Sequence, residues 1–117
     1  MAHKRIASHV RTYRKKSGLT QLELAGLLGH TSIGRVSRHE RGIAIPSLPS
    51  ALGYEAIFRV PIPELFPAIH EAITKGIEAR LVELNSTLGQ KSAKDRDARA
   101  TALKLEFISA RKNTLEI

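Results

Sequence analysis

Apolar residues recur at steps of three and four along most of the chain, which is the spacing of one face of an α-helix. The first such pattern, made of Ile6, Val10 and Tyr13, predicts a helix over residues 5–16 that ends at Ser17 and Gly18. No segment is a convincing strand with alternating apolar and polar residues. The pattern therefore predicts five or six helices and an all-α fold.

Two short helices are predicted next, joined by a tight turn. Thr20 is followed three residues later by Glu23, a spacing that forms a capping box and begins a helix. Gly29 supplies the positive φ that a sharp turn requires. The second helix is expected over about residues 32–41, where Thr31 or Ser32 would cap it and Gly42 would end it.

The remaining apolar positions predict three further helices. Ser47 can cap a helix over residues 48–58, and Pro61 and Pro63 interrupt the next segment. A long amphipathic helix then begins or kinks at Pro67. Its apolar stripe, which must be buried somewhere, consists of Ile69, Ile73, Ile77, Leu81, Leu84 and Leu88.

The last predicted helix follows a polar break over residues 89–94. Ser92 and Asp95 have the spacing of a second capping box, so we expect this helix over about residues 93–112. These patterns divide the chain into a helical domain over residues 1–66 and a C-terminal helical extension over residues 67–117.

Charge is distributed unevenly between these halves. The chain of 117 residues has a formal net charge of +8, and residues 1–59 carry +7 of it, with ten Lys or Arg against three Asp or Glu. Such a basic half indicates a polyanionic partner, although charge alone also fits an ordinary basic surface. There is no cysteine, so disulfides and thiolate metal sites are excluded, and no apolar run is long enough to span a membrane.

Together, these residues resemble the lambda-repressor/Cro (Xre-type) helix-turn-helix family. The resemblance covers about residues 6–66 and rests on two segments, Leu-Thr-Gln-x-Glu-Leu-Ala from residue 19 and Val-Ser-Arg-x-Glu-Arg-Gly from residue 36. It implies a five-helix lambda-repressor-like helix-turn-helix domain that binds double-stranded DNA, with residues 32–41 as the recognition helix in the major groove. It also implies a structural ion pair between Arg14 and Glu40, although a plain phosphate contact by Arg14 is the alternative.

The resemblance further implies which residues meet DNA. Helix N-termini attract phosphates, and hydroxyl and amide side chains there would add hydrogen bonds: Thr20, Gln21, Thr31 and Ser32. The base-reading face would hold Ile33, Gly34, Ser37 and Arg38. Arg38 suits a bidentate contact with guanine or a phosphate contact equally well. The expected phosphate contacts are Arg11, Lys15, Lys16, Arg35 and Arg41.

The sequence departs from the family pattern at four places. Residues 43–45 (Ile-Ala-Ile) are apolar where relatives often carry basic residues, so we expect this loop to pack against a partner or a second subunit. His39 stands where a large apolar residue is usual, and we interpret it as packed rather than as a pH switch. Gly34 weakens the recognition helix by up to ~1 kcal/mol relative to Ala. The stretch from Gly29 to Glu40 is one residue longer than the common spacing, so the turn geometry is open.

No pattern suggests catalysis, a cofactor or a metal. The five histidines lack metal-ligand spacing, and neither a phosphate-binding glycine loop nor a nucleophile elbow is present. We therefore expect a cytoplasmic, nucleoid-associated transcriptional regulator, a repressor that acts as a homodimer through residues 67–117. Two alternatives stay open: the DNA-binding antitoxin of a toxin–antitoxin pair, with a protein partner on the C-terminal helices, or an adaptor that has lost DNA binding.

Overall fold

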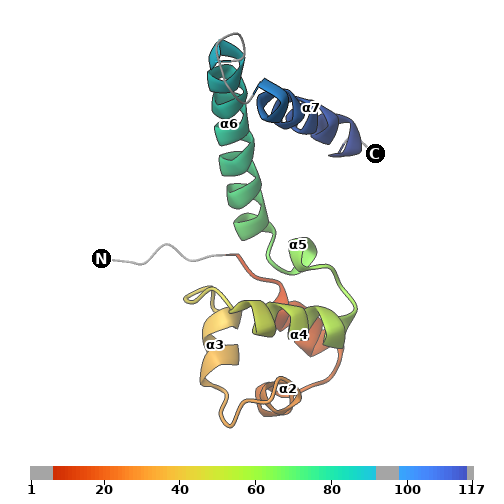
Figure 1. Ribbon diagram of the computed structural model, residues 1–117. Coiled ribbons are helices and arrows are strands. Elements are labelled where there is room, and N and C mark those ends of the chain that lie inside the picture. The colour runs from red at the N-terminus through yellow and green to blue at the C-terminus, as the bar shows by residue number, and fades with distance from the viewer. Residues whose placement is uncertain (1–6, 92–97, 116–117) are drawn as a thin grey trace, which may run out of the picture. The chain divides into compact units, whose positions relative to one another are not determined.

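The computed structural model describes residues 7–91 and 98–115, with side chains described over residues 7–90 and 98–111 (Figure 1). These residues form helices and contain no strand. The helices are α1 (Val10–Lys16), α2 (Gln21–Leu27), α3 (Gly34–Glu40), α4 (Leu48–Phe58), α5 (Ile62–Leu65), α6 (Pro67–Lys91) and α7 (Ala98–Leu115). The predicted all-α class is confirmed, and α5 is the fifth helix of the N-terminal domain, which the resemblance implied and the apolar pattern alone did not locate.

The chain divides into two compact units, Met1–Ala72 and Ile73–Ile117. The first unit contains α1 to α5 and the first turns of α6, and the second contains the rest of α6 and α7. Each unit has its own buried residues and its own polar contacts.

The first unit has a continuous apolar core. Tyr54 of α4 is fully buried and is the largest side chain in it. Around it pack the rings of Phe58 and Phe66, with ring centroids 6.5 and 6.2 Å from that of Tyr54. The other buried core residues come from α1, α2, α3 and α5: Val10, Leu24, Ala25, Val36 and Leu65. All five short helices thus contribute to one core, which fixes the positions of α2 and α3.

The turn between α2 and α3 differs from the expected one. Gly29 adopts the predicted positive φ, at 81°, and the amide of His30 donates to the carbonyl of Ala25 at 2.9 Å. This is the Schellman pattern of helix termination, and it places residues 29 and 30 outside both helices. The chain bends for three more residues, so α3 begins at Gly34, and Thr31 and Ser32 are not its caps as the sequence suggested.

Two other helix ends show what local signals can and cannot predict. The capping box is formed as predicted, because the Thr20 hydroxyl accepts from the Glu23 amide at 3.0 Å and the Glu23 carboxylate accepts from the Thr20 amide at 2.9 Å. In contrast, α1 begins at Val10 rather than at residue 5. The amide of His9 is used instead to donate to the carbonyl of Leu65 at 2.9 Å, which ties the chain before α1 to α5.

The second unit buries far fewer side chains. Leu88 of α6 and Thr101 and Ile108 of α7 are its buried residues among those described. Arg111 of α7 donates to Glu78 of α6 at 3.3 Å. The helix α6 begins at Pro67 as predicted, whereas α7 is described from Ala98 and extends to Leu115, and the predicted Ser92–Asp95 capping box lies outside the described residues.

The expectation that the stripe of α6 is buried is wrong at three of its six positions. Ile73, Ile77 and Leu84 are 58%, 42% and 47% exposed. Leu88 is buried, and Ile69 and Leu81 are partly buried, Ile69 against the core of the first unit. The periodic pattern thus predicted the helix correctly, but it did not predict which positions of the stripe are covered.

Candidate nucleic-acid interface

The helix α3 is held against the first unit by its inner face. Val36 is fully buried among Leu24 and Ala25 of α2, where the small Ala25 side chain allows a close approach of the two helices. The opposite face of α3 carries Ile33, Arg35 and Arg38, all exposed. The arrangement presents a short, firmly seated helix with its polar face outward.

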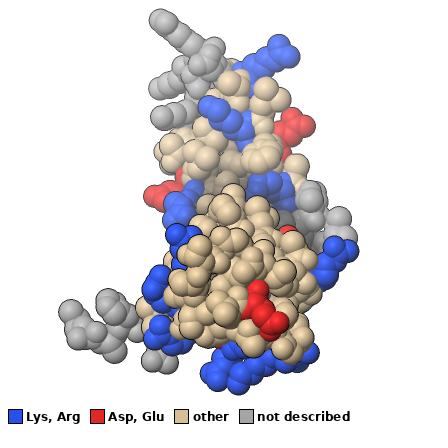
Figure 2. All heavy atoms as spheres, turned by 90° about the horizontal axis from the view of Figure 1, so that it is seen from below, with Lys and Arg blue, Asp and Glu red and all other residues tan. Residues whose placement is uncertain are grey.

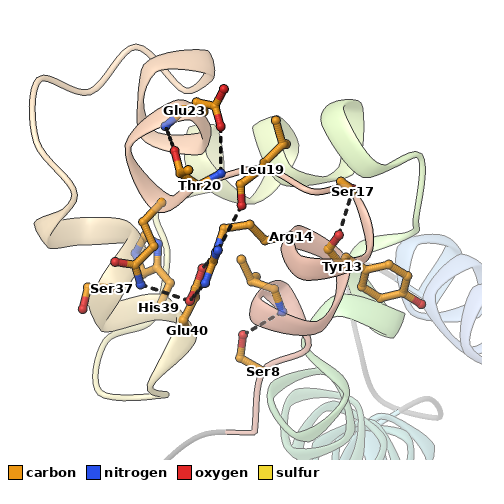
Figure 3. Close-up of polar contacts among 12 residues, drawn as sticks. Ser8, Tyr13, Arg14, Ser17, Leu19, Thr20, Glu23, Ser37, His39 and Glu40 are labelled. Atoms are coloured by element: carbon orange, nitrogen blue, oxygen red, sulfur yellow. Dashed lines mark hydrogen bonds and ion pairs between the residues drawn. The ribbon is translucent and has the colours of Figure 1, made fainter.

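A buried carboxylate connects α1, α2 and α3. Glu40 at the end of α3 has a side chain only 3% exposed, and it accepts hydrogen bonds from both Nε and Nη2 of Arg14 on α1 (Figure 3). Its Oε1 atom also accepts from the amide of Gln21 on α2 at 3.1 Å. The third nitrogen of Arg14 donates to the carbonyl of Leu19 at 3.0 Å. Each of the three nitrogens of this guanidinium thus donates to a protein acceptor, as expected of a structural pair.

The direction of the pKa shift of Arg14 agrees with this geometry. The hydrogen bond to Glu40 raises the pKa of Arg14 above its ordinary value, in spite of partial desolvation. The Arg14 side chain is 13% exposed and is occupied by protein acceptors. Gln21, which the sequence assigned to DNA, is half-buried, and its amide nitrogen is turned to Glu40.

The unusual His39 is buried beneath α3. Its Nδ1 atom lies 2.7 Å from the hydroxyl of Tyr54, and the two rings meet edge to face. Burial lowers the pKa of His39, and the nearby positive charges of His30, Arg38 and Arg35 lower it further. Burial also raises the pKa of Tyr54. The neutral pair fills the site of an apolar residue and satisfies both polar groups, so α3 is joined to α4 by a buried hydrogen bond.

Sequence reasoning missed this His39–Tyr54 contact and the Gln21–Glu40 contact. A signal for the first was present: a histidine at an apolar position needs a polar partner, and only two tyrosines occur in the chain. The second had no local signal, because residues 21 and 40 come together only when the turn between α2 and α3 has its folded geometry.

Two hollows bring several predicted DNA contacts together. The first, of about 380 Å³, is lined by Arg11, Arg14, Gln21, Ser37, Glu40 and Arg41. The second, of about 240 Å³, lies at the turn before α3 and is lined by Gly29, His30, Thr31, Ser32 and Arg35. Each hollow therefore places at least one arginine beside a hydroxyl side chain, a combination that suits phosphate oxygens, and the carboxylate of Glu40 in the first hollow is paired with Arg14.

The other predicted DNA contacts lie on the surface of the first unit. Lys15 and Lys16 are exposed at the end of α1, and Lys16 lies over the ring of Tyr13. Thr20 is exposed, but its hydroxyl caps α2. Arg38 is exposed, and its guanidinium lies close to Gly34 of the same helix. A Cβ atom added to Gly34 would be 3.5 Å from Nη1 of Arg38. Figure 2 shows Lys and Arg side chains in groups along the rim of the face turned to the viewer, with few acidic side chains.

The described residues contain no cluster of His, Asp or Glu side chains that could hold a metal ion. Within the same ranges, no helix has the length and apolarity needed to cross a membrane.

Comparison with protein families gives one match, to a family described as helix-turn-helix, over residues 10–65. The match begins at the first residue of α1 and ends at the last residue of α5, so it contains the whole set of core helices. No curated protein and no solved structure gives a significant match. Domains of this family bind DNA and serve in regulators. Residues 10–65 thus form a helix-turn-helix domain of the lambda-repressor/Cro (Xre-type) family.

Proposed function

We propose that the chain is a sequence-specific DNA-binding transcriptional regulator that acts as a dimeric repressor. The observation that carries the proposal is the seating of α3: its inner face is buried at Val36 and His39, its end is held by Glu40, and its outer face is exposed and basic. A helix held in this way can enter the major groove without losing further conformational freedom.

The base-reading role is proposed for the outer face of α3. Arg38 can donate two hydrogen bonds to the edge of a guanine, and Ile33 can contact a thymine methyl group. Ser37 is half-buried and sits beside the hollow that Arg11 and Arg41 line, so its hydroxyl can reach either a base edge or a phosphate. Gly34 has no side chain, so the backbone of the first turn of α3 can approach the DNA closely.

Contacts with the DNA backbone are proposed for the surrounding groups. Arg11 and Arg41 line one hollow, and Arg35, Thr31 and Ser32 line the other. These contacts carry no base information, but they fix the position of α3 in the groove. Lys15 would add a further cation, whereas Arg14 is excluded from this set because its guanidinium is bound to Glu40 and Leu19.

Dimerisation is proposed for residues 67–117. The exposed apolar side chains of α6 and α7 include Ile73, Ile77, Leu84, Leu103 and Phe107. A pair of helices with so little core does not usually fold alone without staples, and two such hairpins can form a four-helix bundle. A two-fold dimer would then place two α3 helices one turn of DNA apart, and its occupancy of a promoter would exclude polymerase.

The same apolar faces would also suit a different protein, as in the antitoxin alternative. Light scattering of the purified chain separates the two cases. A dimeric mass supports self-association, and a monomer that shifts only with a partner protein supports the alternative.

Sequence-specific binding is tested by selecting bound fragments from genomic DNA and then comparing Arg38→Ala with the unaltered chain. We expect a recurring half-site, and a loss of ~1–3 kcal/mol on the selected DNA that is larger than the loss on unrelated DNA. An equal loss on both DNAs would make Arg38 a phosphate contact, and no enrichment of any fragment would contradict the proposal itself.

A further inference from the structure

The helix α3 begins with a glycine that is covered by an arginine of the same helix. Arg38 follows Gly34 by four residues, so both residues lie on one side of α3. A Cβ atom added to Gly34 would be 3.5 Å from Nη1 and 3.7 Å from Nη2 of Arg38. The guanidinium therefore occupies space that a large side chain at residue 34 would need. This arrangement is called the Gly34–Arg38 contact below.

The same arrangement occurs in α6. A Cβ atom added to Gly76 would be 3.1 Å from Nη2 and 3.3 Å from Nη1 of Arg80, which again follows four residues later. Side chains of a helix lean towards its N-terminus, so a long side chain reaches the residue four positions before it. Where that residue is glycine, no side chain keeps the guanidinium away from the backbone. The Gly34–Arg38 contact thus follows from helix geometry and from the missing side chain at residue 34.

The Gly34–Arg38 contact lies opposite the buried side of α3. Val36 and His39 are the buried residues of this helix. Successive residues of a helix are rotated by about 100° around its axis, so residues 34 and 38 lie on the side that faces away from both. The guanidinium of Arg38 is therefore placed over the middle of the outer face of α3.

The two hollows proposed for phosphates lie on either side of this position. Arg35 lines one hollow, and Ser37 and Arg41 line the other. Arg38 lines neither of them. A helix in the major groove meets phosphates at its sides and base edges along the middle of its outer face. The position of Arg38 between the hollows favours a base contact over a phosphate contact.

We propose that Gly34 is a positioning residue that determines DNA specificity, because it leaves the outer face of α3 to the guanidinium of Arg38 and so directs Arg38 to a guanine. The inference rests on the proposed DNA-binding function and names the base that this part of α3 reads. Guanine is the base whose major-groove edge offers two acceptors to one guanidinium. A larger side chain at residue 34 displaces the guanidinium, and Arg38 then contacts phosphates as other exposed cations do.

The test compares two substitutions of Gly34 in the full chain. Alanine fits, because its Cβ atom would make an ordinary van der Waals contact with the guanidinium at 3.5 Å. Leucine extends beyond Cβ into the space of the guanidinium and offers no hydrogen bond of its own. Both residues have a higher helix propensity than glycine, so neither variant should melt at a lower temperature than the unaltered chain.

The probes are a duplex with the half-site that the unaltered chain enriches and a duplex of the same length with shuffled sequence. Fluorescence anisotropy gives the affinity for each. We expect Gly34→Ala to keep both affinities, and Gly34→Leu to bind the half-site about tenfold more weakly with an unchanged affinity for the shuffled duplex. The matched control is Gly26→Leu, because Gly26 is an exposed glycine of α2 with no described atom within 4 Å of an added Cβ. This control should keep both affinities.

A second measurement separates positioning from a collision between leucine and DNA. If Gly34 acts through Arg38, the variant Gly34→Leu/Arg38→Ala should bind the half-site as weakly as Arg38→Ala alone, without a further loss. A duplex in which one guanine of the half-site is replaced by 7-deazaguanine lacks the N7 acceptor. At one position of the half-site this replacement should weaken binding of the unaltered chain but not of Gly34→Leu.

Four results would overturn the inference. Gly34→Leu could bind the half-site as the unaltered chain does, or it could lose equal affinity for both duplexes. Gly34→Ala could lose as much as Gly34→Leu, which would mean that close approach of the backbone is the whole role of the glycine. The losses of Gly34→Leu and Arg38→Ala could add, which would indicate a collision with DNA. If the unaltered chain enriched no half-site, the proposed function itself would fail, so the two failures are distinguishable.

Discussion

The two units of this protein use their apolar residues in opposite ways. In the first unit, helices of seven residues are held by a shared core, and Val10, Leu24 and Val36 are fully buried. In the second unit, helices of 25 and 18 residues bury little and expose Ile73, Leu84 and Phe107. Short helices gain their stability from tertiary packing, and long ones can form with their apolar faces still open.

The polar contacts differ in the same way. The Arg14–Glu40 pair is buried, bidentate and supported by Gln21, whereas Arg111–Glu78 is a single contact with the Glu78 side chain 44% exposed. Buried charges depend on their partners far more than exposed ones do. The comparison indicates that the polar contacts of the first unit hold one geometry more firmly than those of the second.

The largest effect is expected from breaking the buried pair. Glu40→Ala leaves the guanidinium of Arg14 without its carboxylate and the amide of Gln21 without its acceptor, so we expect a loss of ~3 kcal/mol in the free energy of unfolding of the first unit. Both tyrosines of the chain lie in this unit, so tyrosine fluorescence in a urea titration reports its unfolding alone.

The matched control for that variant is Glu78→Ala, which removes the exposed pair of the second unit. It should change stability by less than ~0.5 kcal/mol, as measured by circular dichroism. Equal losses from both carboxylates would contradict the contrast between the units.

How far the sequence predicts this structure also differs between the units. The capping box at Thr20 and the positive φ of Gly29 depend on nearest neighbours, and both were predictable. The start of α3 was not, because it depends on how the chain leaves α2 and bends before Gly34. Likewise, the period of the apolar stripe on α6 predicts a helix. Whether the stripe is buried depends on the residues that pack against it, and these cannot be identified from the period.

The apolar face of the second unit is the next target. Ile77 and Leu84 lie seven residues apart on one side of α6, so Ile77→Gln/Leu84→Gln removes apolar surface from the proposed dimer contact. We expect a monomeric mass in light scattering and a DNA affinity at least about tenfold lower, since the second helix-turn-helix unit no longer assists. Ala79→Gln, at another exposed position of α6, should leave the mass unchanged.

A smaller loss of folding stability is expected at acidic pH. The pKa of His39 is lowered in the folded state, so the unfolded chain binds more protons below the ordinary histidine value of about 6.5. The stability that the neutral His39 contributes is complete above that pH and is lost as pH falls towards the lowered value. Thermal unfolding should show this decline, and His39→Leu/Tyr54→Phe, which replaces the pair by apolar groups, should reduce it. An unchanged slope in the double variant would contradict the assignment.

The smallest effect concerns the end of α4. Arg59 has φ of 59° and is the non-glycine residue with positive φ among those described. Glycine accepts this conformation without the steric cost that a side chain incurs. Arg59→Gly should therefore raise the melting temperature of the first unit by an amount equivalent to up to ~1 kcal/mol, and Gly29→Ala, at φ of 81°, should lower it. A loss of stability in Arg59→Gly would mean that its side chain has a packing role.

The dependence of DNA affinity on salt tests the account most directly. Each copy has five exposed cations that we propose to contact DNA: Arg11, Lys15, Arg35, Arg38 and Arg41. Each phosphate that they neutralise releases counterions, so a plot of log K against log salt concentration should fall with a slope of about −4.5 per bound copy. A slope near zero, or no binding to duplex DNA at low salt, would contradict the account.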